Sequence, residues 1–319
     1  MVEGKPFSNE FSWSVSGDKV FAECKRKHYY NRYGSWEGWL EKAGKDAKEL
    51  YVLKKLTNKD MWVGSRIHDT IKIVLERIRD GKGISFMEAE KLLEAKMKND
   101  YNDSKQNLFR KNPKFYARFF EHEYALEFGT SEAIDLMEAA KKYLRNFFES
   151  EVYAQLKTVR KSDWLTIDEQ KPTSFYFEGT KVNVKLDAAI RSGGRVVIFD
   201  WKTSRKEDVD YTAQLGCYLL YATRVWKAEA NKVDVFEVNL AQNYVKKHAG
   251  LSAKIDWIEN YMRNSIAGMK SLLRDAKNNV AFEEDYLKVN ELRKCKRCVF
   301  LRVCKPPVLP EGILKSVDY

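Results

Sequence analysis

An acid and a lysine stand two residues apart at the end of an apolar run, in residues 196–205 (VVIFDWKTSR). Side chains alternate along a strand, so Asp200 and Lys202 point to the same face. A carboxylate and an ammonium on one face form either a solvent-exposed strand end or part of a site for metal-dependent hydrolysis. The residues around this pair favour the second alternative, a site for metal-dependent hydrolysis.

A second acid lies on the other arm of a predicted hairpin. Gly193 and Gly194 suit a two-residue turn with positive φ, and this turn places Asp187 directly opposite Asp200. If the turn lies one residue earlier, Asp187 faces Ile198 and is a diagonal neighbour of Asp200 on the same face. Both registers therefore bring the two carboxylates together.

Two neighbouring carboxylates repel each other unless a cation neutralises them. Oxygen ligands with open water positions suit Mg²⁺ or Mn²⁺, which would activate water and stabilise charge on a phosphodiester. Lys202 would then orient or deprotonate that water, or neutralise the developing charge. In the alternative, the acids pair with Lys185 or Lys202 at a solvent-facing strand end.

Further polar side chains flank the hairpin. Gln214 and Tyr218 lie four residues apart on one face of a predicted helix, 209–229. Upstream, His68 stands in GSRIHDTI, near the start of a predicted amphipathic helix, 61–81. These residues favour a site over a plain strand end.

Three of the five cysteines fall within CKRCVFLRVC, at Cys295, Cys298 and Cys304. The N-terminus lacks an apolar signal core, so we expect a reducing compartment and no disulfide framework. A metal or cluster site usually needs a fourth ligand. Cys217 lies on an apolar helix face, where a cysteine behaves as a small hydrophobe, so Cys24 is the better candidate. The spacing alone fits structural zinc and an iron–sulfur cluster equally.

The periodicity of the 319 residues predicts an α/β or α+β fold, with helices packed on a small sheet. Helical patterns extend from residue 61 to 160, and Ser85 with Glu88 forms a capping-box signature. Further helices are predicted at 209–229 and 251–277. The strands are predicted at 163–168, 174–179, 181–190, 195–201 and 233–240.

The net charge of +11 favours a polyanionic partner. Basic and aromatic residues alternate near Cys24, as in proteins that bind single-stranded nucleic acid; we take Lys25, Arg26, Tyr29 and Tyr30 as candidates. The alternative for these rings is an aromatic core with a solvated basic face. No apolar stretch approaches 18 residues, so we expect no membrane partner.

The order of these motifs resembles the PD-(D/E)xK nucleases of the RecB-type branch. The resemblance rests on Gly64-x-x-x-His68, Asp187, Asp200-x-Lys202 and Gln214-x-x-x-Tyr218. It implies a restriction-endonuclease-like core, with a small central mixed sheet flanked by helices. It also implies that Asp187, Asp200 and His68 bind metal, that Lys202 is catalytic, and that Gln214 and Tyr218 support the site and the DNA.

The resemblance implies one further acid on the preceding strand, for which Glu169 is our candidate and Asp168 its alternative. The chain departs from the commonest pattern in two places. Leu186 replaces the proline before Asp187, and the second acid is Asp200 instead of glutamate.

The cysteine pattern is similar to that of AddAB-type nuclease domains and of the iron–sulfur nucleases of CRISPR adaptation. This resemblance implies a structural [4Fe–4S] cluster held by Cys24, Cys295, Cys298 and Cys304, which would join residues 285–310 to 20–30. The expected organisation is a single nuclease domain, 1–319, with a catalytic core at 163–240 and a helical insertion at 71–160.

We therefore expect a cytoplasmic, Mg²⁺- or Mn²⁺-dependent hydrolase that cuts DNA, with single strands or DNA ends as substrate and exonuclease action favoured. Repair, recombination, CRISPR adaptation and mobile-element biology all fit this activity. The sequence has no G-x-x-x-x-G-K-[ST] motif, so we expect either a stand-alone nuclease domain or one that works with a partner such as a helicase or another DNA-processing protein. The alternative is a non-catalytic iron–sulfur or zinc subunit that binds nucleic acid, against which the intact Asp187, Asp200 and Lys202 argue.

Overall fold

The computed structural model describes residues 9–169, 173–206 and 209–305. The chain forms two compact units. Unit 1 comprises Met1–Leu56, Tyr176–Val182 and Asn260–Tyr319, and unit 2 comprises Thr57–Phe175 and Asn183–Glu259. Within the described residues, no helix combines the length and apolar character that a membrane crossing requires.

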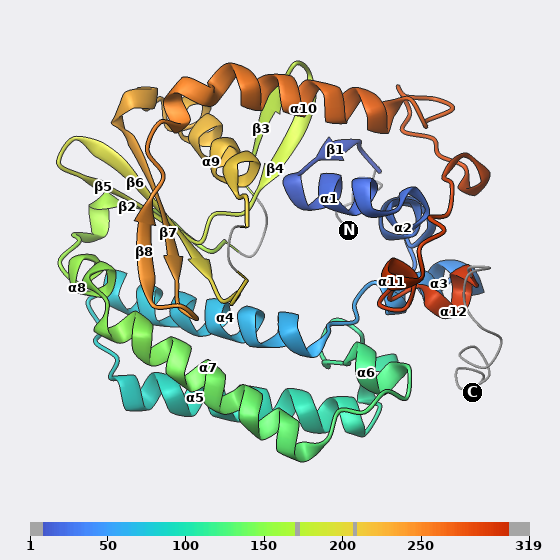
Figure 1. Cartoon of the computed structure of the whole chain (residues 1–319), viewed down its shortest axis with the longest axis horizontal. Helices are drawn as coiled ribbons and strands as arrows, with labels where there is room; N and C mark the ends of the chain where they lie inside the picture. The colour runs from blue at the N-terminus through green and yellow to red at the C-terminus, as the bar shows by residue number, and fades with distance from the viewer. Residues whose placement is uncertain (1–8, 170–172, 207–208, 306–319) are drawn as a thin grey trace, which may run out of the picture. The chain divides into compact units, whose positions relative to one another are not determined.

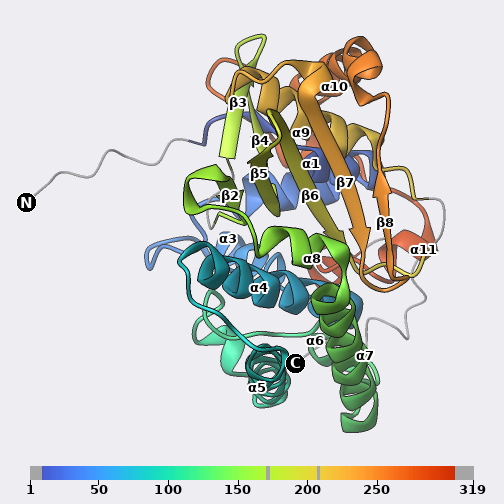
Figure 2. The same ribbon diagram turned by 90° about the vertical axis from the view of Figure 1, so that its left-hand side faces the viewer.

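Unit 2 is built on a five-stranded mixed sheet (Figure 2). Its strand order is β2 (Trp164–Ile167), β5 (Ala188–Ser192), β6 (Arg195–Lys202), β7 (Val233–Asn239) and β8 (Tyr244–Lys247). Strands β6 and β7 are parallel, and the other neighbours are antiparallel. A parallel pair needs a crossover connection, which helix α9 (Thr212–Arg224) provides. The small mixed sheet with flanking helices agrees with the expected fold class.

The turn between β5 and β6 has the register in which Gly193 and Gly194 are the two turn residues. Gly193 and Gly194 have φ of 56° and 74°, as a two-residue turn of this kind requires. Ser192 pairs with Arg195, and the ladder continues to Ala188 and Phe199. Asp187 therefore precedes the last ladder pair, and Asp200 follows it.

The prediction of one continuous strand over 181–190 is wrong. Residues 180–184 form β4 (Thr180–Val184), which lies in a three-stranded sheet of order β1-β4-β3 with β1 (Ser12–Trp13) and β3 (Thr173–Phe177). The chain leaves β4 and bends before β5 begins. At the bend the Asp187 carbonyl accepts the Asp168 amide at 2.8 Å, so the backbone of Asp187 binds the end of β2.

Helix α4 (Lys59–Arg79) packs against β2 and against two long helices, α5 (Phe86–Lys105) and α7 (Thr130–Glu149) (Figure 1). The short helices α6 (Phe120–Glu123) and α8 (Glu151–Leu156) complete this layer. Ser85 and Glu88 form the expected capping box at the start of α5. Trp201 lies in the hydrophobic core with Ile67, Ile71 and Phe147, as expected for the residue between Asp200 and Lys202.

A buried acid joins α4 to α5. The Asp100 carboxylate, 2% exposed, accepts a hydrogen bond from Trp62 Nε1 at 2.9 Å. It also forms ion pairs with Arg66 at 3.2 Å and Lys96 at 3.3 Å. Since a buried charge is stable only when it is paired, this group fixes the part of α4 that carries His68.

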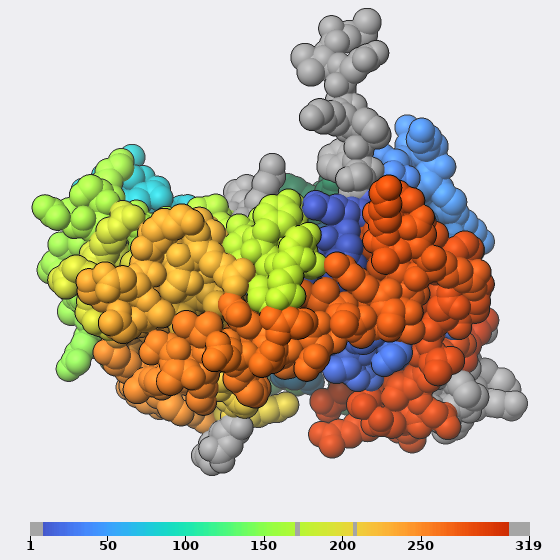
Figure 3. Space-filling view, turned by 90° about the horizontal axis from the view of Figure 1, so that it is seen from above, coloured from blue at the N-terminus to red at the C-terminus, as the bar shows by residue number. Residues whose placement is uncertain are grey.

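In unit 1 the N-terminal residues lie beside residues from the C-terminal part of the chain (Figure 3). Arg26 donates to the Tyr286 carbonyl, and Trp13 donates to Ser265, both at 2.8 Å. The unit contains α1 (Val15–Glu23), α2 (Lys25–Tyr29), the π-helical turn Tyr30–Gly34, α3 (Lys45–Leu53), α11 (Leu292–Cys295) and α12 (Leu301–Cys304). Helix α10 (Ile255–Lys270) occupies most of the helix predicted at 251–277.

Candidate active site

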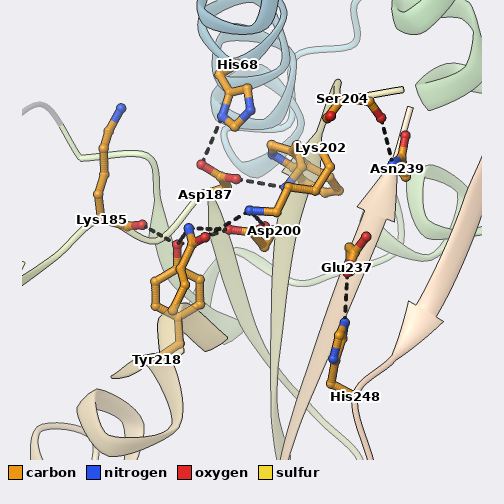
Figure 4. Close-up of polar contacts among 12 residues, drawn as sticks. His68, Lys185, Asp187, Asp200, Lys202, Ser204, Tyr218, Glu237, Asn239 and His248 are labelled. Carbon is orange, nitrogen blue, oxygen red and sulfur yellow. Dashed lines mark hydrogen bonds and ion pairs between the residues drawn. The ribbon is translucent and has the colours of Figure 1, made fainter. Parts of the chain in front are cut away.

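Asp187 is fixed by two contacts at the bend before β5. Its Oδ2 accepts the backbone amide of Trp201 at 2.8 Å, and its Oδ1 lies 3.0 Å from His68 Nδ1 (Figure 4). The side chain is 7% exposed. Because the Trp201 amide stands between Asp200 and Lys202, the first contact holds Asp187 against the β6 motif.

Helix α4 supplies His68, and Gly64 lets the helix approach the strand end. A Cβ at Gly64 would lie 2.9 Å from Thr203 Oγ1, closer than side chains normally pack. Thr203 directly follows β6. Gly64 and His68 are four residues apart and so share a helix face. The small residue therefore lets this face of the helix lie against the loop that follows Lys202.

Asp200 and Lys202 lie side by side on β6, as strand alternation predicts. Lys202 Nζ is 2.6 Å from Asp200 Oδ2 and lies 3.9 Å from the centre of the Tyr211 ring. Although this oxygen is ion-paired, it receives no hydrogen bond within the described part of the chain. Lys202 donates instead to Gln214 Oε1 at 3.0 Å.

Helix α9 brings Gln214 and Tyr218 to the other oxygen of Asp200. Gln214 Nε2 donates to Asp200 Oδ1 at 3.2 Å and to the Tyr218 hydroxyl at 2.7 Å. The Tyr218 hydroxyl lies 3.0 Å from Asp200 Oδ1 and 2.9 Å from the Lys185 carbonyl. It has one proton, so it donates to one of these oxygens at a time. The four-residue spacing of Gln214 and Tyr218 therefore brings both side chains to the Asp200 carboxylate.

The environments of the two carboxylates push their pKa values apart. Burial raises the pKa of Asp200, and the Asp187 charge adds to this effect, against the opposing effect of Lys202. Burial also acts to raise the pKa of Asp187, but His68, the Trp201 amide and Lys202 outweigh it and lower that pKa. His68 has a raised pKa because the charge and hydrogen bond of Asp187, with the charges of Asp200 and Asp168, together outweigh the effect of burial. Of the two carboxylates, Asp187 is therefore the one whose ionised form the cluster favours.

A third acid lies next to Asp187, at the end of β2. Asp168 is buried, its Oδ1 lies 2.8 Å from Lys185 Nζ, and its φ of 26° is unusual for a residue other than glycine. Glu169 is exposed and accepts a hydrogen bond from Thr166 at 3.3 Å. The charge of Asp168, and not that of Glu169, helps to raise the pKa of His68. Of the two alternatives, the structure places Asp168 at the cluster.

A fourth acid, Glu237 on β7, was not among the candidates predicted from the sequence. Glu237 is the register partner of Asp200 in the parallel pair and is 4% exposed. Its carboxylate accepts a hydrogen bond from the Tyr244 hydroxyl at 2.6 Å. It also lies 2.9 Å from His248 Nε2 (Figure 4). The sequence signal for Glu237 was that a charged residue stands inside the apolar run VDVFEVNL. Strand β8, which carries Tyr244, was not predicted either, because its four residues are exposed.

The donor set at the hairpin suits a hard divalent cation. Asp187 and Asp200 offer carboxylate oxygens, the preferred ligands of Mg²⁺ and Mn²⁺. Asp200 Oδ2 is enclosed, and the ammonium of Lys202 balances the charge of this carboxylate. No three His, Cys, Asp or Glu side chains of the described residues lie together as ligands of one ion.

A family model described as the PD-(D/E)XK nuclease superfamily matches residues 12–305. The chain belongs to this superfamily. Members of the PD-(D/E)XK superfamily are generally metal-dependent nucleases and typically use Mg²⁺ or Mn²⁺. The family match therefore supports a nuclease as the general class of enzyme for this chain.

Two other comparisons accompany the match to the PD-(D/E)XK superfamily. No curated protein matches the chain. Among solved structures, one described as "Crystal structure of SSO0001" is 14% identical, and the match covers 67% of this chain and 86% of that chain. The TM-score of that pair is 0.27.

Outside the PD-(D/E)XK site, the four candidate cluster cysteines line a single pocket in unit 1. Cys24, Cys295, Cys298 and Cys304 all face it, together with Lys27, Lys288 and Lys294. Burial raises the pKa of the Cys298 thiol to about 12, and Lys27 opposes this effect. Cys217 is 1% exposed on α9 in unit 2, as expected for a small buried hydrophobe.

The prediction that Arg26 and Tyr30 bind DNA is not supported by their positions. Tyr30 is 3% exposed, and its hydroxyl donates to Glu283, so its face is not available to a base. Arg26 pairs with the same glutamate and donates to the Tyr286 carbonyl. Tyr29 packs against Tyr30, Tyr33 and Tyr286. Most of these rings therefore belong to an aromatic core. Lys25, half-buried, lies over the Phe21 ring.

Proposed function

We propose that this chain is a metal-dependent DNA nuclease that hydrolyses phosphodiester bonds in single-stranded DNA or at DNA ends, by exonuclease action. One observation carries the proposal. Two carboxylates and a lysine meet where the β5–β6 hairpin ends, and each has a partner that fixes its position. The net charge of +11 supports a polyanionic substrate.

In the proposed site Asp187, Asp200 and His68 hold a Mg²⁺ or Mn²⁺ ion. When bound, such an ion supplies Lewis acidity to the phosphate and lowers the pKa of water. Asp187 suits this role because its pKa is lowered by His68 and the Trp201 amide, and because that amide fixes its orientation. We assign the additional acid to Asp168 in place of Glu169, since Asp168 is buried beside the cluster.

Lys202 is the proposed catalytic base or charge stabiliser. Its ammonium balances the charge of Asp200 in this structure, and with a bound cation providing that balance Lys202 would be available to the substrate phosphate. Gln214 holds both groups, because it accepts from Lys202 and donates to Asp200. Tyr218 restrains the same carboxylate and the Lys185 backbone. These two residues therefore position the pair without touching the reacting atoms.

We also propose that Cys24, Cys295, Cys298 and Cys304 hold a structural [4Fe–4S] cluster. Its support is the shared pocket, which Cys24, from the N-terminal part of the chain, lines together with the three clustered cysteines of the C-terminal part. A cluster takes one thiolate on each of four irons, whereas zinc takes all four at about 2.3 Å. The lysines around the pocket would offset the charge of the thiolates.

The biological setting that we propose is DNA repair or recombination, CRISPR adaptation or a mobile element, in the cytoplasm. A nuclease of this kind would draw on a helicase or another DNA-processing protein for unwinding. The supporting observation is the lack of a nucleotide-binding motif in the sequence.

The test uses four substrates with Mg²⁺ or Mn²⁺: linear single strands labelled at either end, circular single strands and blunt duplex. We expect degradation of the linear single strands and no cutting of the circles. Cutting of circles would contradict exonuclease action. Binding of every substrate without cleavage would favour a non-catalytic nucleic-acid-binding subunit.

A further inference from the structure

Unit 1 carries a group of cations close to one aromatic ring. Lys54 and Lys55 follow the end of α3, and their ammonium groups lie 5.5 and 5.6 Å from the centre of the same ring, that of Tyr51. Lys54 Nζ has one weak hydrogen bond, to the Asn31 carbonyl at 3.4 Å. Arg32 adds a third positive charge, which contributes to lowering the pKa of Lys54.

This arrangement is costly in the free protein. Burial, together with the charges of Lys55 and Arg32, lowers the pKa of Lys54 to about 8. Among the described residues, no acid is a cause that opposes this shift at Lys54. Arg32 donates to the Glu10 carbonyl and the Ser12 hydroxyl, and the charge of Glu10 acts on Arg32. The like charges of Lys54 and Lys55 repel each other, and a bound anion would relieve the repulsion.

The ring that both lysines approach carries a hydroxyl without a partner. Tyr51 is 5% exposed, and its hydroxyl is enclosed and unpaired within the described residues. An unpaired buried hydroxyl is destabilising, and an anion oxygen could accept from it once the side chains that enclose it move. Within the described residues, Lys54 therefore lacks a counter-charge and Tyr51 lacks a hydrogen-bond acceptor.

We propose that Lys54, Lys55 and Tyr51, with Arg32 behind them, form a binding site for the phosphate groups of a nucleic-acid strand. The site belongs to unit 1, whereas the candidate active site belongs to unit 2. It therefore acts in holding substrate and not in cutting it. The identity of the strand as substrate rests on the proposed nuclease function.

The test measures binding of a fluorescent oligothymidylate by the full chain at several salt concentrations. Lys202→Ala is present in every sample to prevent cleavage. Lys54→Ala, Lys55→Ala and Tyr51→Phe are compared with Lys45→Ala, which removes the same charge from an exposed position at the other end of α3.

We expect Lys54→Ala and Lys55→Ala each to weaken binding roughly three- to tenfold and to lower the salt slope by about 0.7. Tyr51→Phe should weaken binding by a smaller factor without lowering the melting temperature, because it removes an unpaired hydroxyl. Lys45→Ala should leave both quantities unchanged. Equal binding by all four variants would overturn this site and leave the nuclease proposal standing. A chain that binds no oligonucleotide at any salt concentration would overturn both.

Discussion

The Asp187 carboxylate accepts the backbone amide of Trp201 at 2.8 Å, and this contact sets the distance between the two acids of the site. Trp201 is itself held in the core by ring contacts with Phe147 and Phe199. The position of Asp187 therefore depends on the core of unit 2 as well as on its own strand. Catalytic groups need this kind of rigid support, since small displacements cost large factors in rate.

Gly64→Ala should impair cleavage through the packing of α4. The new Cβ would meet Thr203 Oγ1 at 2.9 Å, so helix or loop must shift and His68 moves relative to Asp187. We expect roughly a tenfold to hundredfold loss of activity. Thr203→Ala removes the clashing atom, so the double variant should regain most of the activity. A double variant as impaired as Gly64→Ala would show that the contact is not responsible.

Asp100→Asn should destabilise unit 2 by about 3 kcal/mol, because it leaves Arg66 and Lys96 without their buried counter-charge. Denaturant unfolding measures the change. Asp135→Asn, on the exposed surface of α7, is the matched control and should stay within about 0.5 kcal/mol of wild type. The two variants would be equally stable if the buried ion pairs contributed nothing.

His28 should make unit 1 less stable in acid. Burial, and then the charge of Arg32, lower the pKa of His28 to about 4, whereas the unfolded residue titrates near 6.5. Between these values only the unfolded chain binds the proton, so stability falls as the pH drops from 6.5 to 4, by about 3 kcal/mol. His28→Phe keeps a ring against Phe21 and Tyr286 and should remove this part of the pH dependence. Unfolding curves at pH 7, 6 and 5 compare the two proteins, and parallel pH profiles would argue against a neutral His28.

The cysteine pocket should yield a visible chromophore. Protein purified without air should contain about four irons per chain and absorb in the visible range. Cys298→Ser, which changes a pocket cysteine, should lose both signals, whereas Cys217→Ser should keep them. Colourless protein with zinc in place of iron would refute the cluster and leave a four-thiolate zinc site.

The sequence predicted the parts of the site that depend on local geometry. The two glycines determined the register of the hairpin, and alternation placed Asp200 with Lys202. Helical spacing placed Gln214 with Tyr218 on the same carboxylate.

The features that the sequence did not predict depend on contacts between distant segments. The chain bends at Asp187 because its carbonyl and side chain bind β2 and β6, which periodicity within 181–190 does not reveal. The sequence around Arg26 and Tyr30 is typical of a nucleic-acid surface. In the structure both residues pair with Glu283, which lies far along the chain. Glu237 joins the site only through its parallel partner, Asp200.

The most direct test of the account is cleavage of a linear single-stranded oligonucleotide with Mg²⁺ or Mn²⁺ by the wild-type chain and Lys202→Ala. Lys142→Ala, on the exposed surface of α7, serves as the matched charge control. We predict metal-dependent cleavage by wild type and Lys142→Ala, and a loss of about 10²–10³-fold in Lys202→Ala. An inert wild-type chain, or a Lys202→Ala variant that cuts as fast as wild type, would contradict the account.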